Sequence, residues 1–80
     1  MLTVQVIDAA KANAGLSEVE IVCDAEGLLL LERQLEFLKK GATHIHLMTP
    51  SWAGNELTEQ VTREGADLVN HLRVTMVPPR

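Results

Sequence analysis

Hydrophobic and polar residues alternate in two stretches near the start of the chain, residues 2–8 and 18–23. The apolar positions are Leu2, Val4 and Val6 in the first stretch and Val19, Ile21 and Cys23 in the second. Because successive side chains of a strand point to opposite faces, both stretches are predicted to be strands with one buried face. The residues between them, 9–17, carry a turn signal at Asn13–Gly15 and are expected to form a loop.

The next segment, residues 25–40, has the 3.6-residue periodicity of an amphipathic helix. Asp24 stands at the N-cap position, where its carboxylate can accept hydrogen bonds from the first turn. Gly41 stands where a left-handed residue commonly ends a helix. The apolar stripe predicted to be buried consists of Leu28, Leu31, Leu35 and Leu38, widened by Leu30 and Phe37.

Alternation returns in residues 43–48, "THIHLM", and Pro50 ends this third strand because proline has no amide hydrogen to donate. Residues 69–77 are predicted to form a fourth strand, with Leu72, Val74 and Met76 facing inward. Residues 49–68 lie between these strands and are expected to be an ordered loop.

These elements predict an α+β fold with two layers, in which one main helix covers one face of a four-stranded mixed sheet (β-β-α-β-β). A strand, helix, strand succession with short joints is typical of a right-handed crossover, so the second and third strands are expected to be parallel. The 80 residues are enough for one small domain, spanning residues 1–80.

The composition argues against several classes of function. Apolar residues are 46% of the chain and charged residues 22%, as in ordinary globular domains. The net charge is -4, the basic residues are scattered, and there is no Tyr and one Phe for stacking bases, so no nucleic-acid partner is expected. The longest apolar run, residues 28–31, is too short for a membrane span. A single cysteine and no signal peptide indicate the cytoplasm.

The third predicted strand places His44, His46 and Met48 on one face and Ile45 and Leu47 on the other. Since one helix covers one face, the two apolar residues are expected to meet the helix and the histidines to lie on the open face. The two imidazoles could chelate zinc, with Glu20 or His71 as a third ligand. No HExxH or CxxC pattern accompanies them, so a solvated or partner-facing surface is the stronger interpretation, with no metal and no cofactor.

Catalysis is not expected, and we predict that the chain is not an enzyme. The candidate nucleophiles are Ser17, Ser51 and Cys23, but the cysteine points toward the core by alternation and neither serine lies in a nucleophile-elbow pattern. Trp52 has two interpretations, which overlap. It either folds back over the edge of the core or serves as an interface anchor.

Three segments resemble the immunity protein 32 family of bacterial polymorphic toxin systems: "CDAEGLLLLERQLEFL", "HIHLMTPSWAGNEL" and "NHLRVTMV". The most specific parts are a D-x-E-G helix entry, an H-x-H-L strand and a W-x-G-x-E-L loop. The matching residues are Asp24, Glu26 and Gly27, then His44, His46 and Leu47, then Trp52, Gly54, Glu56 and Leu57. The resemblance implies a cytoplasmic bacterial protein that binds and neutralises a cognate toxin domain, without catalysis.

The residues expected to bind the partner follow from their clustering beside the open face and not from the family. They are His44, His46, Met48, Trp52 and Glu56. Glu18 and Glu20, together with Glu56, are expected to steer a basic partner. Two other functions stay open: a small homodimeric structural or regulatory module, and a zinc-binding protein that uses the strand of His44 and His46.

Overall fold

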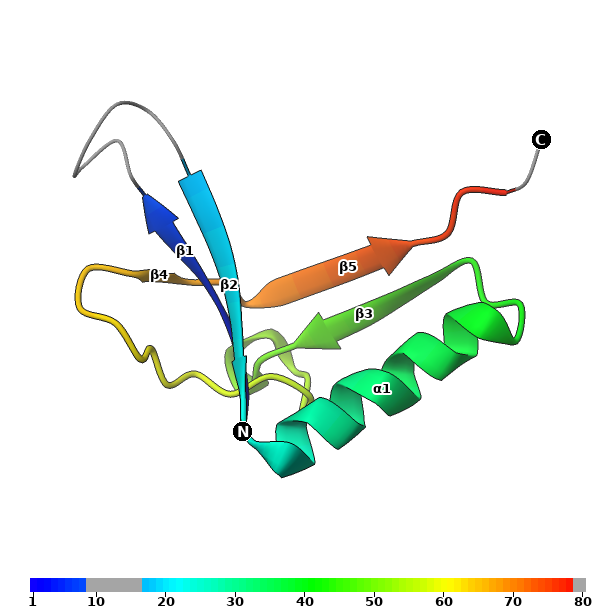
Figure 1. Ribbon diagram of the computed structural model, residues 1–80, viewed down its shortest axis with the longest axis horizontal. Coiled ribbons are helices and arrows are strands. Elements are labelled where there is room, and N and C mark those ends of the chain that lie inside the picture. The colour runs from blue at the N-terminus through cyan, green and yellow to red at the C-terminus, as the bar shows by residue number, and fades with distance from the viewer. Residues whose placement is uncertain (9–16, 79–80) are drawn as a thin grey trace.

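The computed structural model describes residues 1–8 and 17–78 and shows an α+β architecture (Figure 1). The expected loop over residues 9–16 lies outside this described part. Within it are one α-helix, α1, a 3₁₀ turn, η1, and five strands in two small antiparallel sheets. The elements are β1 (Leu2–Asp8), β2 (Ser17–Cys23), α1 (Ala25–Lys39), β3 (His44–Met48), η1 (Pro50–Trp52), β4 (Asp67–Leu68) and β5 (His71–Thr75).

The last strand segment joins the two sheets. One sheet has the order β2-β1-β4, and the other consists of β3 and β5. β4 pairs with β1, placing Gln5 opposite Leu68, and the Val69 amide then donates to the Val4 carbonyl at 2.9 Å. After Asn70 the chain continues as β5 and pairs with β3 instead. The segment that contains β4 and β5 therefore pairs first with one sheet and then with the other.

The single four-stranded mixed sheet expected from the sequence is not found. The fourth strand, predicted over residues 69–77, is two pieces separated by Val69 and Asn70. β2 and β3 lie in different sheets, and every strand pair among residues 1–8 and 17–78 is antiparallel. The helix connects the edge of one sheet to the edge of the other, so it is not a parallel crossover within one sheet.

The entry of α1 is built as the sequence predicts. The Asp24 carboxylate accepts hydrogen bonds from the Gly27 amide at 2.8 Å and from the Met1 amino group at 2.6 Å. The bond from the Met1 amino group, followed by that from the Gly27 amide, lowers the pKa of Asp24. A Cβ on Gly27 would lie 1.7 Å from the Met1 carbonyl oxygen, so the glycine is required for close packing. Among the described residues, no helix is long and apolar enough to cross a membrane.

The exit of α1 also follows the prediction. Gly41 has φ 110°, a backbone conformation that favours glycine. The Ala42 amide donates to the Phe37 carbonyl at 2.9 Å, as in the hydrogen-bonded motif that commonly closes a helix. The helix ends at Lys39, one residue before the predicted boundary.

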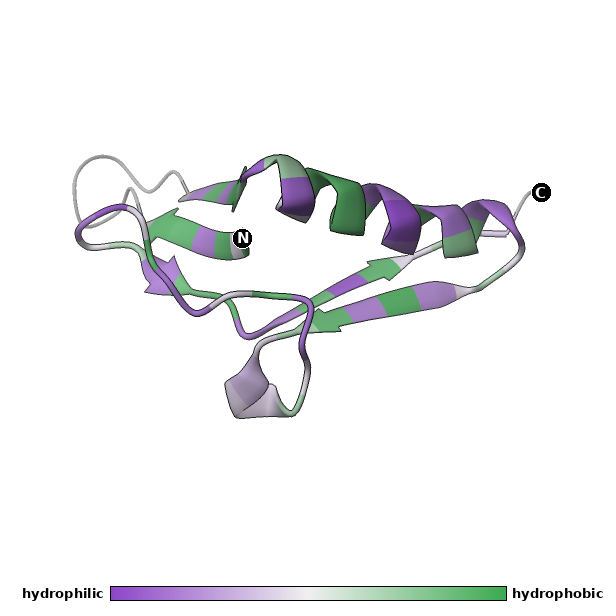
Figure 2. Ribbon diagram, turned by 90° about the horizontal axis from the view of Figure 1, so that it is seen from below, coloured by the Kyte–Doolittle hydropathy of each residue, from purple (hydrophilic) through white to green (hydrophobic). Residues whose placement is uncertain are grey.

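The core lies between α1 and the strands, with the helix on one side of both sheets and η1 on the other (Figure 2). Ile45 and Leu47 are buried under the helix, as predicted. The buried apolar residues are Leu2, Val4, Leu38, Ile45, Leu47 and Leu57. Each contributes about 1.5–3 kcal/mol of stabilisation when removed from water.

The prediction that the helix also covers β2 is wrong. Val19 is 64% exposed and Ile21 is 45% exposed, although both face the helix side of their sheet. The predicted helix stripe is likewise only partly buried, because Leu28, Leu35 and Phe37 are exposed. The reason is the direction of α1, which leaves the end of β2 and runs beside β3 (Figure 1).

The opposite face of the first sheet is closed, contrary to expectation. Thr3 and Gln5 are both 0% exposed. Thr3 Oγ1 donates to the Gln60 carbonyl at 3.0 Å, and Gln5 Oε1 accepts from the Thr62 amide at 3.1 Å. The segment between residues 58 and 62 therefore covers this face and satisfies its buried polar groups. The open face is confined to the second sheet.

We predict that Leu47→Ala lowers the free energy of unfolding by about 2–5 kcal/mol, because Leu47 is 0% exposed and its removal leaves a cavity. Leu29→Ala is the matched control. Leu29 is 46% exposed on the outer side of α1, and its replacement should change stability by less than about 0.5 kcal/mol. Urea denaturation of both variants measures the difference, and equal losses would contradict the assigned core.

Candidate functional site

The open face of the second sheet gathers three histidines. In the antiparallel register of β3 and β5, His46 lies opposite Arg73 and Met48 lies opposite His71, and opposite residues share a face. His46 Nδ1 and His71 Nε2 are 2.7 Å apart, and the two rings stack with centroids 4.9 Å apart. The His44 ring meets the His46 ring edge-on at 4.8 Å. The three imidazoles form one continuous row.

The bond between His46 and His71 needs one N–H donor and one unprotonated nitrogen, so the pair cannot keep it with both rings fully protonated. Desolvation lowers the pKa of His46, and the nearby charges of His44, His71 and Arg73 lower it further. At neutral pH the row therefore favours an uncharged His46 that can donate and accept hydrogen bonds.

Trp52 lies beside this row. It ends η1, and its ring centroid is 5.9 Å from that of His71. The residue is 55% exposed, so it does not fold back over the core. The exposed indole and the three imidazoles together form the histidine–tryptophan face, which we define as His44, His46, His71, Arg73 and Trp52.

The loop after β3 holds Trp52 in place through tight backbone contacts. The Thr49 carbonyl accepts from the amides of Trp52 and Gly54, both at 2.9 Å. A Cβ on Gly54 would lie 2.5 Å from the Met48 carbonyl oxygen, so only glycine fits there. The buried Leu57 then returns the chain to β3, its amide donating to the Met48 carbonyl at 3.1 Å. The spacing of Trp52, Gly54 and Leu57 is thus explained by this docked loop.

Two glutamates complete the loop. The Glu56 carboxylate accepts from the Met48 amide at 3.1 Å and from the Asn55 amide at 3.2 Å. Glu59 accepts from the Ser51 amide at 2.8 Å, and hydrogen bonds from the Ser51 side chain and backbone lower its pKa. Glu56 therefore acts in positioning the loop, which the sequence pattern alone does not reveal.

Among the five residues expected to bind a partner, the structure places His44, His46 and Trp52 together and exposed. Met48 is half-buried at the end of the same row, and Glu56 is half-buried with its carboxylate directed to backbone amides. His71 and Arg73 belong to the cluster but were not among the five. Their alternation placed them on the open face, and only the register of β3 and β5 shows that they adjoin His46.

Two of the three carboxylates expected to steer a basic partner, Glu18 and Glu20, lie elsewhere. Arg63 pairs with Glu18 at 3.6 Å and with Glu20 at 3.3 Å, beside the first sheet. Glu20 also accepts from Gln5 Nε2 at 2.7 Å. The histidine–tryptophan face instead carries Arg73 and three imidazoles.

In the part of the chain that the structure describes, no group of three or more His, Cys, Asp or Glu side chains is placed to hold a metal ion. Glu20, one of the third ligands considered for zinc, is bound to Gln5 and Arg63 instead. Cys23 is half-buried, and register places it opposite Leu2 on the helix side of its sheet. What the geometry shows is an exposed row of imidazoles beside an exposed indole.

No family model matches the chain, and comparison with curated proteins and with solved structures gave no match either. The likeness to immunity proteins therefore depends on the three short motifs alone.

We predict that stability falls between pH 7.5 and pH 5.5 through His46. Its pKa is lowered in the folded state, so the unfolded chain takes up the proton first and folding is disfavoured as the pH drops through about 6.5. Asp24 and Glu59 lose their contributions only at lower pH, because they are carboxylates with lowered pKa values. The Tm of His46→Asn should change less over this range than that of the parent, and an equal change would contradict the assignment.

We also predict that Gly54→Ala displaces the loop, because its Cβ would meet the Met48 carbonyl oxygen. The expected loss is about 1–3 kcal/mol of stability, with a shift in the fluorescence of Trp52, the one tryptophan of the chain. Ala53→Gly is the control: Ala53 has φ 64°, which glycine adopts without strain, so stability should be kept or slightly raised. Unchanged fluorescence in Gly54→Ala would show that the loop is not docked as described.

Proposed function

We propose that this chain is a binding protein of the immunity class that neutralises a cognate toxin domain in the bacterial cytoplasm. The histidine–tryptophan face is the contact surface, and inhibition is steric. The single observation that carries the proposal is the exposed indole of Trp52 beside the stacked rings of His46 and His71. The resemblance of the H-x-H-L and W-x-G-x-E-L motifs to immunity protein 32 supports it.

Such a surface suits tight association. Tryptophan and arginine are enriched among the residues that dominate binding energy, and this face offers Trp52 and Arg73 together. Trp52 lies on a loop held by backbone hydrogen bonds and by Glu56, so little conformational entropy is lost when a partner binds. The imidazoles supply donors and acceptors around the aromatic centre.

The charge of the face indicates the chemistry of the partner. Arg73 and the three imidazoles favour a neutral or acidic contact surface on the toxin domain. The carboxylates of Glu18 and Glu20 both pair with Arg63 and lie beside the other sheet. This revises the expectation of a basic partner.

Co-production with the toxin domain encoded next to the gene tests the proposal. The toxin domain alone should arrest growth, and co-production of this chain should restore growth and yield a complex that copurifies. Trp52→Ala and His46→Ala should each weaken the complex at least tenfold, measured by calorimetry, because each truncates the centre of the surface.

Leu29→Ala, on the outer side of α1, is the matched control and should bind as the parent does. All variants are checked for folding by circular dichroism. Full neutralisation by a folded Trp52→Ala, His46→Ala double variant would contradict the proposed surface, and absence of rescue by the parent chain would contradict the function.

A further inference from the structure

A hydrogen bond between two side chains joins β3 to β5 outside the backbone ladder. His46 lies opposite Arg73 and His71 lies opposite Met48, so the two histidines are diagonal neighbours on one face of the strand pair. Diagonal positions are within reach of ring side chains. His46 Nδ1 and His71 Nε2 are 2.7 Å apart, and the rings stack with an interplanar angle of 30°. We call these two residues the histidine latch.

The latch closes only while one of its two facing nitrogens is unprotonated. A hydrogen bond between imidazoles needs an N–H on one ring and a lone pair on the other. When both rings are protonated, each carries N–H donors on both nitrogens, and two like charges face each other across this contact. The second proton therefore removes the acceptor and adds repulsion at the same place.

The charged groups that act on His46 are all cationic when protonated. They are His44 on its own strand and His71 and Arg73 on β5. The carboxylates of the neighbouring loop, Glu56 and Glu59, accept hydrogen bonds from backbone amides. Within the described part of the chain, a second proton on the latch is therefore met by cations and by carboxylates that are already engaged.

The latch also contacts Trp52. The Trp52 ring centroid lies 5.9 Å from that of His71, and the two rings are tilted by 39°. The backbone of Trp52 is fixed, because its amide donates to the Thr49 carbonyl at 2.9 Å. Its side chain is 55% exposed, so the direction of the indole depends on the ring beside it. A displacement of His71 therefore frees the indole.

We propose that the histidine latch is a pH-sensitive switch for the direction of the Trp52 indole. With one of the facing nitrogens unprotonated, His46 holds the His71 ring against the indole. When both rings carry the extra proton, the pair separates and the indole loses its contact with His71. The loop backbone stays in place in both states.

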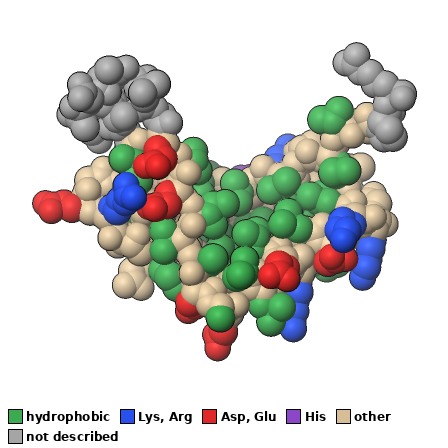
Figure 3. Space-filling view, in the orientation of Figure 1, with side chains coloured by type: hydrophobic (Ala, Val, Ile, Leu, Met, Phe, Trp, Pro, Cys, Tyr) green, Lys and Arg blue, Asp and Glu red, His purple; other side chains and the backbone are tan. Residues whose placement is uncertain are grey.

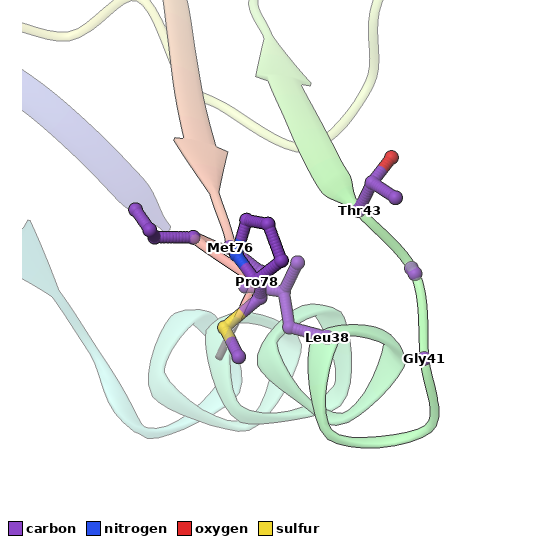
Figure 4. Close-up of a pocket in the computed structure, with 7 residues that line it drawn as sticks. Leu38, Gly41, Thr43, Met76 and Pro78 are labelled. Carbon is purple, nitrogen blue, oxygen red and sulfur yellow. The ribbon is translucent and has the colours of Figure 1, made fainter. Parts of the chain in front are cut away.

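The latch can open without unfolding the core, because the two lie on opposite faces of β3. Ile45 and Leu47 are buried toward α1, where apolar side chains gather between the helix and the strands (Figure 3). His44 and His46 alternate with them and are exposed. A pocket of about 250 Å³ lies between the end of α1 and the segment after β5 (Figure 4). Among the described residues, its lining has no acidic or basic side chain. Protonation of the latch therefore acts on the exposed face.

The pH at which the latch opens follows from His46. Desolvation lowers the pKa of His46, and the neighbouring charges named above lower it further from its ordinary value of about 6.5. A ring released into water loses these effects and takes up the proton more readily, so a falling pH favours the open pair. The latch is therefore closed above about pH 6.5 and opens below it. Glu59 keeps the loop in place over this range, because a hydrogen bond from the Ser51 side chain holds its pKa below the ordinary value of 4.5.

Nuclear Overhauser effects measured on the free chain test the latch. At about pH 7.5 we expect contacts between the ring protons of His46 and His71, and between those of His71 and Trp52. At about pH 5 both sets should be lost, while the contacts between Leu47 and Leu72 across the strands remain. Ring contacts that persist at the lower pH would overturn the proposal. So would loss of the contacts between the two leucines, because the whole sheet would then have opened.

Two substitutions separate the latch from the rest of the row. His46→Asn should remove the pH dependence of the contact between His71 and Trp52, because an amide oxygen accepts a hydrogen bond from His71 in either protonation state. His44→Asn is the matched variant, since it removes the ring at the other end of the row. Its transition should remain and move to a higher pH, because one cation beside His46 is lost. A transition that persists in His46→Asn, or disappears in His44→Asn, would contradict the latch.

The latch does not rest on the proposed function, because it is measured on the free chain with no toxin domain present. A chain that rescues growth but shows no transition would support the binding surface and refute the latch. A chain that shows the transition but gives no rescue would do the reverse. Failure of one proposal therefore does not decide the other.

Discussion

Two hydrogen bonds between Thr49 and Asn70 hold together the end of β3 and the start of β5. The Thr49 amide donates to the Asn70 carbonyl at 3.0 Å, and the Thr49 hydroxyl donates to Asn70 Oδ1 at 2.7 Å. Thr49 is 0% exposed, so a polar partner here is required, and leaving its hydroxyl unpaired would cost about 1–3 kcal/mol. The contact lies where the chain passes from β4 to β5 and where the loop of Trp52 begins. The contact therefore links the point where the chain leaves the first sheet for the second to the loop that positions the Trp52 indole.

The division of the sheets determines which surfaces are free. A helix of 15 residues that runs beside β3 cannot also cover β2, so Val19 and Ile21 stay exposed on the helix side. The residues between 58 and 62 close the other face of the first sheet through Thr3 and Gln5. The histidines of the second sheet keep their solvent exposure. Two separate uncovered surfaces result, one polar and aromatic, the other apolar.

Local features could be predicted from the sequence because they depend on neighbouring residues. The capping of α1 by Asp24 and the alternation that exposes His44 and His46 both follow from short-range rules. The interruption of the last strand at Val69 and Asn70 does not follow from such rules, because the inward positions Leu72 and Val74 continue the pattern of one long strand. It depends on hydrogen bonds to distant parts of the chain.

The burial of the helix stripe and the role of Glu56 could not be predicted from the sequence, for the same reason. Which leucines are buried depends on the direction of α1 relative to two sheets, and periodicity shows only that one face is apolar. The Glu56 carboxylate was expected to contact a partner, and its bonds to the Met48 and Asn55 amides depend on the fold of the loop. The pairing of His46 with His71 required the register of β3 and β5.

Cross-strand nuclear Overhauser effects test the division of the strands into two antiparallel sheets. We expect contacts between His46 and Arg73 and between Leu47 and Leu72, together with contacts between Gln5 and Leu68. We expect none between β2 and β3. A ladder of contacts joining β2 to β3 in parallel register would contradict this division, because the histidines and the exposed Val19 and Ile21 would then belong to one continuous sheet.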